Sequence, residues 1–331
     1  FADYCGSKYA VGVSSGTDAL LEALMVLGIG ADDEVIVPAY SFFATAGVVA
    51  RLGAKPVFVD IEPRGLNIDP SLIEERITGR TRAIMPVHLF GQIAEMDEIT
   101  KTAEAHGLAV IEDAAQAVGA EWRGQRAGSL GVMGCFSFFP SKNLGGFGDG
   151  GAITAADDEL DQKLIDFRVH GMRPKYYHHA VGGNFRLDAL QAAILEVKLR
   201  HLDGWTEARQ RNAARYGEQL GDLVGEGRLI LPEILPERRH VFNQYVVRFP
   251  EGREARDRVR DHLAEKGIGS EIYYPVTLPA QVCFRGLEDH EKRFPVSETA
   301  AETSLALPVF AELTESEVDL VAERIREALQ A

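Results

Sequence analysis

The sequence has few cysteines and too few basic residues for a nucleic-acid binder. Only three of 331 residues are cysteine, and their spacing is unlike that of a metal site. An odd number without a pairing pattern favours free thiols in a reducing compartment, so we expect a cytoplasmic protein without a structural metal. Lys and Arg number 35 against 50 Asp and Glu, a formal net charge of −15. This balance argues against nucleic-acid binding but leaves an anionic small molecule open.

Long apolar runs and a secretory signal pattern are also absent. No run approaches the roughly 20 residues of a membrane span, so we expect no membrane partner. The chain begins with Phe1 rather than methionine, and we expect a natural segment upstream of it. Its length predicts one large and one smaller domain, and its 46% hydrophobic and 26% charged residues are ordinary for a globular protein.

A single lysine follows a strand-like aromatic run. Residues 135–139 meet Pro140, and Lys142 then enters a glycine-rich turn at Gly145. Lysine is strongly hydrated and is rarely buried without a function. At a sheet edge beside glycines it suits a Schiff-base lysine, whereas an exposed lysine between glycines is the structural alternative. The sequence before and after this segment is needed to distinguish the two alternatives for Lys142.

A second signal lies at a predicted helix start. Residues 11–13 predict a short strand, and Ser15, Gly16 and Thr17 then precede apolar residues at helical spacing. Unpaired amides at such a helix start suit a phosphate, and Thr17 adds a hydroxyl. Simple N-capping is the structural alternative.

Short apolar runs alternate with helix-like stretches through the first half of the chain. We expect strands at residues 34–38, 56–60, 83–88 and 109–113, and helices that include 44–52 and 96–106. Such alternation predicts an α/β fold with a mostly parallel sheet that is covered on both faces. Ligands of such sheets gather at the carboxyl ends of the strands, where the sequence places Phe42, His88, Asp113, Ser137 and Lys142.

Asp113 ends one of these strands, and Gln116 follows one helical turn later. A carboxylate at the end of a buried strand is costly unless it is paired with a cation or several donors. Either Asp113 caps the following helix, or it holds a protonated heteroaromatic nitrogen, in which case Gln116 reaches the same ligand.

The chain changes character from Arg186 onward. Apolar residues at helical spacing run from Leu187 past Trp205 to Leu220, which predicts a long helix leaving the first domain. A strand near 245–249 and helices near 254–266 and 315–329 follow. We therefore predict a large domain over residues 1–205 and a small α+β domain over 206–331.

Five short motifs occur in one order along the chain. They read SGTDAL from Ser15, EDAAQ from Glu112, SFFPSKN from Ser137, GDGG from Gly148 and GNFRLD from Gly183. Together they resemble the DegT/DnrJ/EryC1/StrS family of sugar aminotransferases, which use pyridoxal 5′-phosphate (PLP). The resemblance spans nearly the whole chain. It implies the fold-type-I, aspartate aminotransferase-like α/β architecture and a homodimer with active sites at the subunit interface.

The resemblance also implies roles for single residues. Lys142 is expected to form the Schiff base, Asp113 to pair with the pyridinium nitrogen and Gln116 to contact the 3′ oxygen. Phe42 is expected to stack on the cofactor ring. The phosphate is expected to be bound by Gly16, Thr17 and Ser137, and Asn184 is expected to reach into the partner's site.

The substrate region departs from the family pattern. Relatives often have histidine where this chain has Tyr273 and Pro279, in a loop that is expected to contact the sugar through Tyr274. His88 is a further candidate, although a structural histidine bonded to backbone is an equal alternative. A basic and aromatic cluster before Asn184 supplies three more candidates, with a solvated loop as the alternative: Lys175, Tyr176 and His178.

The implied reaction moves an amino group from an amino acid, glutamate in most of the family, to a nucleotide-linked keto sugar in deoxyamino sugar biosynthesis. The motifs around His88 and Arg186 favour C-3 over C-4 as the acceptor carbon. Two alternatives stay open: a PLP- or pyridoxamine-dependent sugar dehydratase, and a non-catalytic regulatory protein on the same fold. Dehydratases of this family replace the lysine with histidine, so Lys142 argues against the first.

Overall fold

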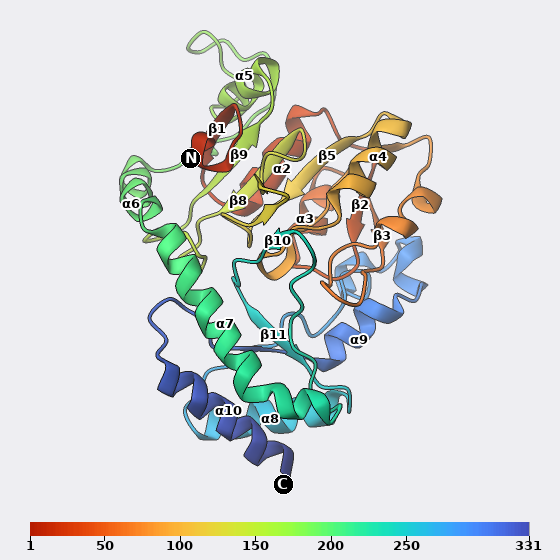
Figure 1. The fold of residues 1–331 in the computed structure, drawn as a ribbon. Coiled ribbons are helices and arrows are strands. Elements are labelled where there is room, and N and C mark those ends of the chain that lie inside the picture. The colour runs from red at the N-terminus through yellow and green to blue at the C-terminus, as the bar shows by residue number, and fades with distance from the viewer. Residues whose placement is uncertain (331) are drawn as a thin grey trace.

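The computed structural model describes residues 1–330 and has a seven-stranded sheet at its centre (Figure 1). The strand order is β1-β9-β8-β5-β4-β2-β3. The strands are β1 (Tyr9–Val13), β2 (Glu34–Pro38), β3 (Lys55–Val59), β4 (Thr81–Ile84), β5 (Ala109–Asp113), β8 (Met133–Ser137) and β9 (Gly151–Ala155). The neighbours from β8 to β3 all pair in parallel, whereas β9 is antiparallel to both β8 and β1. The predicted mostly parallel sheet is confirmed.

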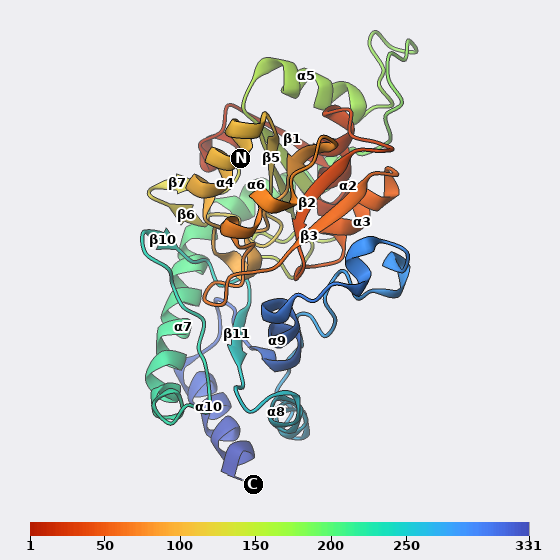
Figure 2. The same ribbon diagram turned by 90° about the vertical axis from the view of Figure 1, so that its right-hand side faces the viewer.

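Helices cover both faces of this sheet (Figures 1 and 2). They are α2 (Gly16–Val26), α3 (Ala44–Arg51), α4 (Met96–His106) and α5 (Asp158–Phe167). Successive strand residues point to opposite faces, and β2 shows the consequence. Val35 and Val37 pack into one apolar cluster with α2 and α3, and Ile36 packs into a second cluster with α4. Strands buried on both faces explain the continuous apolar runs of the sequence.

The chain leaves this layer through two helices where one was predicted. α6 (Ala189–Leu199) and α7 (Leu202–Gly225) are separated at residues 200–201. The break lets the chain turn: Leu195 and Leu202 pack on the core of the large sheet, while Leu220 belongs to the C-terminal core. The strand expected over 83–88 is also shorter, because β4 ends at Ile84 and only Val87 forms a further bridge, to Asp113.

The C-terminal part is a small α+β unit. The two-stranded antiparallel sheet of β11 (Tyr245–Arg248) and β12 (Ser304–Leu307) shares one apolar cluster with α7, α8 (Arg253–Glu265) and α10 (Glu315–Gln330). Leu278, Phe284 and Phe294 instead pack into the core of the large sheet. The segment that carries these three residues therefore packs on the large sheet although it follows residue 205 in the chain. The division of the chain into two domains at residue 205 stays a prediction.

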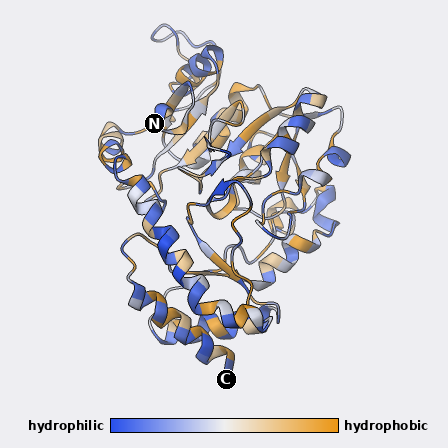
Figure 3. Ribbon diagram, viewed as in Figure 1, coloured by the Kyte–Doolittle hydropathy of each residue, from blue (hydrophilic) through white to orange (hydrophobic). Residues whose placement is uncertain are grey.

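The remaining elements are short or peripheral. They are α1 (Ala2–Cys5), α9 (Pro295–Thr303), β6 (Glu121–Trp122), β7 (Gln125–Arg126) and β10 (Arg238–Arg239). Apolar and polar residues alternate along α10 in Figure 3, and the buried ones include Val318, Val321 and Ile325. Such amphipathic helices pack on a core with one face. None of the helices within residues 1–330 combines the length and the apolarity that crossing a membrane requires.

Candidate active site

A cavity of about 560 Å³ lies where β5 and β8 end and α2 begins. The carboxyl ends of neighbouring parallel strands meet at one edge of a sheet, so the residues that follow β5 and β8 converge there. Of the residues predicted to bind cofactor or substrate, those that line the cavity are Gly16, Thr17, Phe42, Asp113, Gln116, Ser137, Lys142 and Tyr274. The structure therefore brings together residues that are up to 258 positions apart in the chain.

Lys142 follows β8 and reaches into this cavity. Its backbone N–H donates to the carbonyl of Phe139 at 2.8 Å, and the N–H of Gly146 donates to Phe138 at 2.7 Å. This turn fixes the lysine directly after the strand end. Burial lowers the pKa of Lys142 from 10.5 to about 8, and the nearby charge of Asp113 opposes the shift. About a tenth of the amine is therefore uncharged at pH 7, far more than for a lysine at its ordinary pKa, and a nucleophilic lysine reacts in this uncharged form.

Asp113 is the last residue of β5 and is only 4% exposed. One carboxylate oxygen accepts from the Thr45 hydroxyl at 2.8 Å, and the other accepts from the Ala115 N–H at 3.2 Å. Burial raises the pKa of Asp113, while these two hydrogen bonds and the charge of Lys142 lower it. A carboxylate has about four acceptor positions, so Asp113 keeps free capacity for a protonated ligand atom in the cavity.

The start of α2 forms another wall of the cavity. Ser15 caps the helix by accepting the Asp18 N–H at 3.0 Å. A Cβ atom at position 16 would lie 2.7 Å from the Cβ of Ser137, so only glycine allows α2 to approach β8 this closely. The first N–H groups of a helix have no intrahelical acceptor, which makes Gly16 and Thr17 an anion-binding position beside Ser137.

Aromatic and amide groups form a further wall. Gln116 accepts the Phe90 N–H at 2.7 Å through its oxygen and donates to the Tyr274 hydroxyl at 3.0 Å. The rings of Phe42 and Tyr274 have centroids 6.1 Å apart. Phe42 is 56% exposed, which leaves its face available to a planar ligand.

Other predicted site residues lie outside this cavity. Asn184 pairs with Val169 in a segment that projects beyond α5 (Figures 1 and 2), and the exposed Lys175, Tyr176 and His178 lie on the same segment. His88 is fully buried, with both ring nitrogens engaged by Glu112 and by the Ala94 N–H. The geometry therefore favours the structural alternative for His88 and corrects its assignment to the substrate.

Comparison with known proteins decides the family. The model of the DegT/DnrJ/EryC1/StrS aminotransferase family matches residues 1–326. The chain belongs to this family. A pleiotropic regulatory protein of Geobacillus stearothermophilus is 49% identical over 326 residues, which cover 98% of this chain and 86% of that protein. A UDP-N-acetyl-3-dehydro-alpha-D-glucosamine 3-aminotransferase of Acidithiobacillus ferrooxidans is 46% identical over 328 residues, with 99% and 86% covered.

Solved structures of similar proteins agree with this fold. DesV of S. venezuelae in complex with a ketimine intermediate has a TM-score of 0.94 and 42% identity, covering 100% of this chain and 87% of that one. NtdA of Bacillus subtilis with bound PMP has a TM-score of 0.91 and 34% identity, with 100% and 75% covered. These comparisons confirm the predicted fold class, the aminotransferase class and PLP as the cofactor of this family member.

The cavity fits PLP on its own observations. It offers a lysine of lowered pKa for the aldehyde, and Asp113 has free acceptor capacity for the ring nitrogen. A helix start free of side chain at Gly16 suits the phosphate, and the exposed face of Phe42 suits the ring. The residue roles themselves stay predictions. The roles of the residues that line the cavity are chemically consistent with one another.

Sequence reasoning missed several residues of the site. Thr45 bonds Asp113 from α3, but a lone threonine in an alanine-rich helix gave no signal. Asp149 lines the cavity and had a signal, since it belongs to the GDGG motif. Glu271 also lines the cavity, and it forms a bridge to Ala306 of the C-terminal unit that the sequence does not signal.

Proposed function

We propose that this family member transfers an amino group from glutamate to C-3 of a nucleotide-linked keto sugar. The observation that carries the chemistry is the placement of Lys142 and Asp113 in one cavity with an anion-binding helix start. The choice of C-3 is supported by the relative from Acidithiobacillus, which is named as a 3-aminotransferase of a UDP-linked sugar. The three cysteines are free, which suits a reducing compartment, and the proposal includes a cytoplasmic location.

The residues of the chain have separate tasks in this reaction. When bound, PLP supplies an electron sink for the carbon that exchanges its proton. Asp113 keeps a proton on the ring nitrogen by ionic pairing, which maintains that sink. With the cofactor bound, the Nζ atom of Lys142 would serve as general base and general acid, taking a proton from the substrate carbon and holding it for return. Its lowered pKa suits both steps near neutral pH.

We further propose a homodimer in which Asn184 completes the partner's site. Asn184 does not line the cavity of its own chain. The segment that carries it projects from the body and exposes Tyr177 and Val181 at 66% and 89%. Exposed apolar side chains on a projecting segment are typical of an interface. In a two-fold dimer both copies of the segment are equivalent, so each site gains one asparagine.

The test is a screen of purified protein against UDP- and dTDP-linked sugars with a keto group at C-3 or C-4, with glutamate as donor. We expect 2-oxoglutarate and a 3-amino sugar, detected by mass spectrometry. Amination of the 4-keto sugars alone would refute the position. Conversion without a donor would indicate the dehydratase.

A regulatory role is the second candidate, because the relative from Geobacillus carries a regulatory name. A protein that only regulates has no need for a buried lysine of lowered pKa next to a carboxylate. Purified protein that forms a PLP adduct at Lys142 but exchanges no amino group with any amino acid would favour this candidate.

A further inference from the structure

A buried polar network lies directly behind Asp113, on the opposite face of β5. Glu112 precedes Asp113 in the strand, so its side chain points away from the cavity, which it does not line. Both Glu112 and His88 are 0% exposed. In the part of the chain that the structure describes, His88 is the only basic side chain within 4.0 Å of the Glu112 carboxylate. A buried carboxylate without a cation requires several donors.

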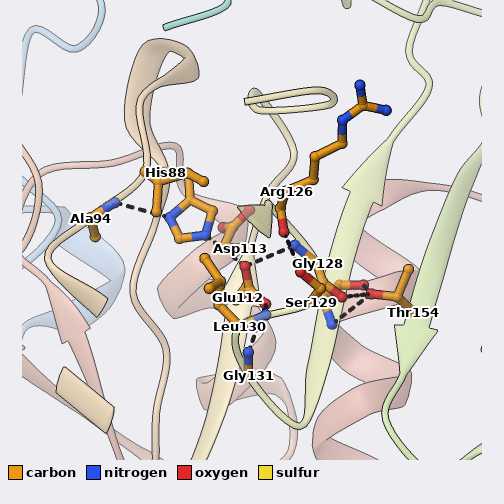
Figure 4. Close-up of polar contacts among 12 residues, drawn as sticks. His88, Ala94, Glu112, Asp113, Arg126, Gly128, Ser129, Leu130, Gly131 and Thr154 are labelled. Atoms are coloured by element: carbon orange, nitrogen blue, oxygen red, sulfur yellow. Dashed lines mark hydrogen bonds and ion pairs between the residues drawn. The ribbon is translucent and has the colours of Figure 1, made fainter. Parts of the chain in front are cut away.

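Four donors surround this carboxylate (Figure 4). One oxygen accepts the N–H groups of Leu130 and Gly131, both at 2.8 Å. The other accepts the N–H of Gly128 at 2.8 Å and lies 2.9 Å from Nε2 of His88. All acceptor positions of the carboxylate are therefore used, in contrast to those of Asp113.

The tautomer of His88 follows from its other contact. Nδ1 accepts the N–H of Ala94 at 3.2 Å, so Nδ1 carries no proton. The proton of the neutral ring is then on Nε2, which donates to Glu112. His88 thus links the loop after β4 to β5 as a neutral donor.

The network joins three segments that carry the site. His88 follows β4 and donates its own N–H to the carbonyl of Asp113 at 3.0 Å. Glu112 is in β5, and residues 128–131 form the turn into β8, whose far end carries Ser137 and leads to Lys142. In the resulting register Asp113 lies opposite Cys135 of β8. The turn is closely packed, since a Cβ at position 131 would lie 2.5 Å from the carbonyl oxygen of Val110.

We propose that Glu112 and His88 are positioning residues that set the location of Asp113 relative to Lys142. The inference rests on the proposed function in that Asp113 and Lys142 are its reacting groups. Glutamine cannot replace Glu112, because its NH₂ group would face a backbone N–H donor in either orientation of the amide. The turn before β8 would then move away from β5. This movement would displace Lys142, which follows β8, relative to Asp113 in β5, and misplaced reacting groups lower rates strongly.

The main experiment compares Glu112→Gln with a matched control, Asp60→Asn. Asp60 is another buried carboxylate without a Lys or Arg partner among residues 1–330, and it accepts the N–H groups of Ile61, Val296 and Ser297. It lies outside the cavity. We expect both variants to melt at lower temperature. Only Glu112→Gln should also weaken PLP binding and lower kcat by about tenfold or more, with KM for glutamate nearly unchanged.

Equal PLP affinity and kcat in Glu112→Gln and wild type, within about twofold, would overturn the proposal and leave a merely structural role. PLP affinity is measured by absorbance without any sugar substrate. The positioning role can therefore be tested even if the protein aminates none of the sugars in the screen. Failure of the proposed function and failure of the positioning role are thus distinguishable.

If Glu112→Gln does not fold, two milder variants of His88 test the proposal instead. His88→Gln keeps an N–H for Glu112, and His88→Asn keeps only an acceptor for Ala94. We expect His88→Asn to weaken PLP binding about threefold or more, and His88→Gln to restore most of the affinity. Equal affinity of both variants and wild type would overturn the proposal. So would a ¹⁵N NMR spectrum of the cofactor-free protein that shows the His88 proton on Nδ1 at pH 7.

Discussion

The reactivity of Lys142 in the cofactor-free protein is the property that the site geometry predicts most sharply. Burial lowers its pKa from 10.5 to about 8. At pH 7 about a tenth of Lys142 is then the neutral amine, against about 0.03% of a lysine at its ordinary pKa. The site therefore offers about 300 times more reactive amine than an exposed lysine would. This magnitude distinguishes an active-site lysine from a glycine-flanked surface lysine.

The informative perturbation is Asp113→Asn. The charge of Asp113 raises the pKa of Lys142 and partly opposes burial. Removing that charge leaves burial unopposed, so the pKa falls further and the amine becomes neutral at lower pH. Asp149→Asn is the matched control, because Asp149 also lines the cavity but does not shift the pKa of Lys142.

The assay follows the rate of PLP addition to cofactor-free protein between pH 6 and 10, with borohydride trapping and mass spectrometry of the adduct. For wild type we expect a rate that levels off above about pH 8, and for Asp113→Asn a profile displaced to lower pH. A rate that still rises at pH 10 would refute the lowered pKa. An unchanged profile in Asp113→Asn would show that Asp113 carries no charge in the empty site, and an adduct on Lys101, Lys163 or Lys175 would refute the assignment of the lysine.

Three further predictions follow from the same contacts. Lys142→Met should abolish turnover yet stabilise the cofactor-free protein at pH 7 by at most about 3 kcal/mol. The unfolded chain holds the lysine proton more tightly than the folded protein, so the stability of the wild type should rise between pH 8 and 10.5, which calorimetry measures. Gly16→Ala should weaken PLP binding by about tenfold or more, because its Cβ would collide with Ser137, and a titration by absorbance measures this. Mixing inactive Lys142→Ala and Asn184→Ala proteins under subunit exchange should restore activity above either parent, since one site of the mixed dimer is wild type; no restoration despite proven exchange would refute the shared site.

Much of the fold could be predicted because its signals are local. β5 spans residues 109–113 and α4 spans 96–106, as expected, since a buried strand and an amphipathic helix each carry their own periodicity. The break between α6 and α7 could not be predicted. Residues 200–201 contain neither proline nor glycine, and the turn there depends on two separate cores that Leu202 and Leu220 join.

The cavity-lining residues that belong to the five sequence motifs could be predicted, whereas those that reach the cavity only through tertiary contacts were harder to predict. Motif residues such as Gly16 and Lys142 follow strand ends or begin helices, and a parallel sheet brings those positions together. Thr45 acquires its role only because α3 packs beside the end of β5. His88 had the right position at a strand end, but its ring turns to the buried face to meet Glu112.

Glu112 and Asp113 show why adjacent acids in one motif have different tasks. The two-residue period of a strand sends them to opposite faces of the sheet. Glu112 meets four donors and has no free acceptor position, so it can only hold structure. Asp113 meets two donors and faces a cavity, so it can bind a ligand proton. The number of donors around each carboxylate, rather than its residue type or burial, is therefore the observation on which we propose positioning for Glu112 and a part in the reaction for Asp113.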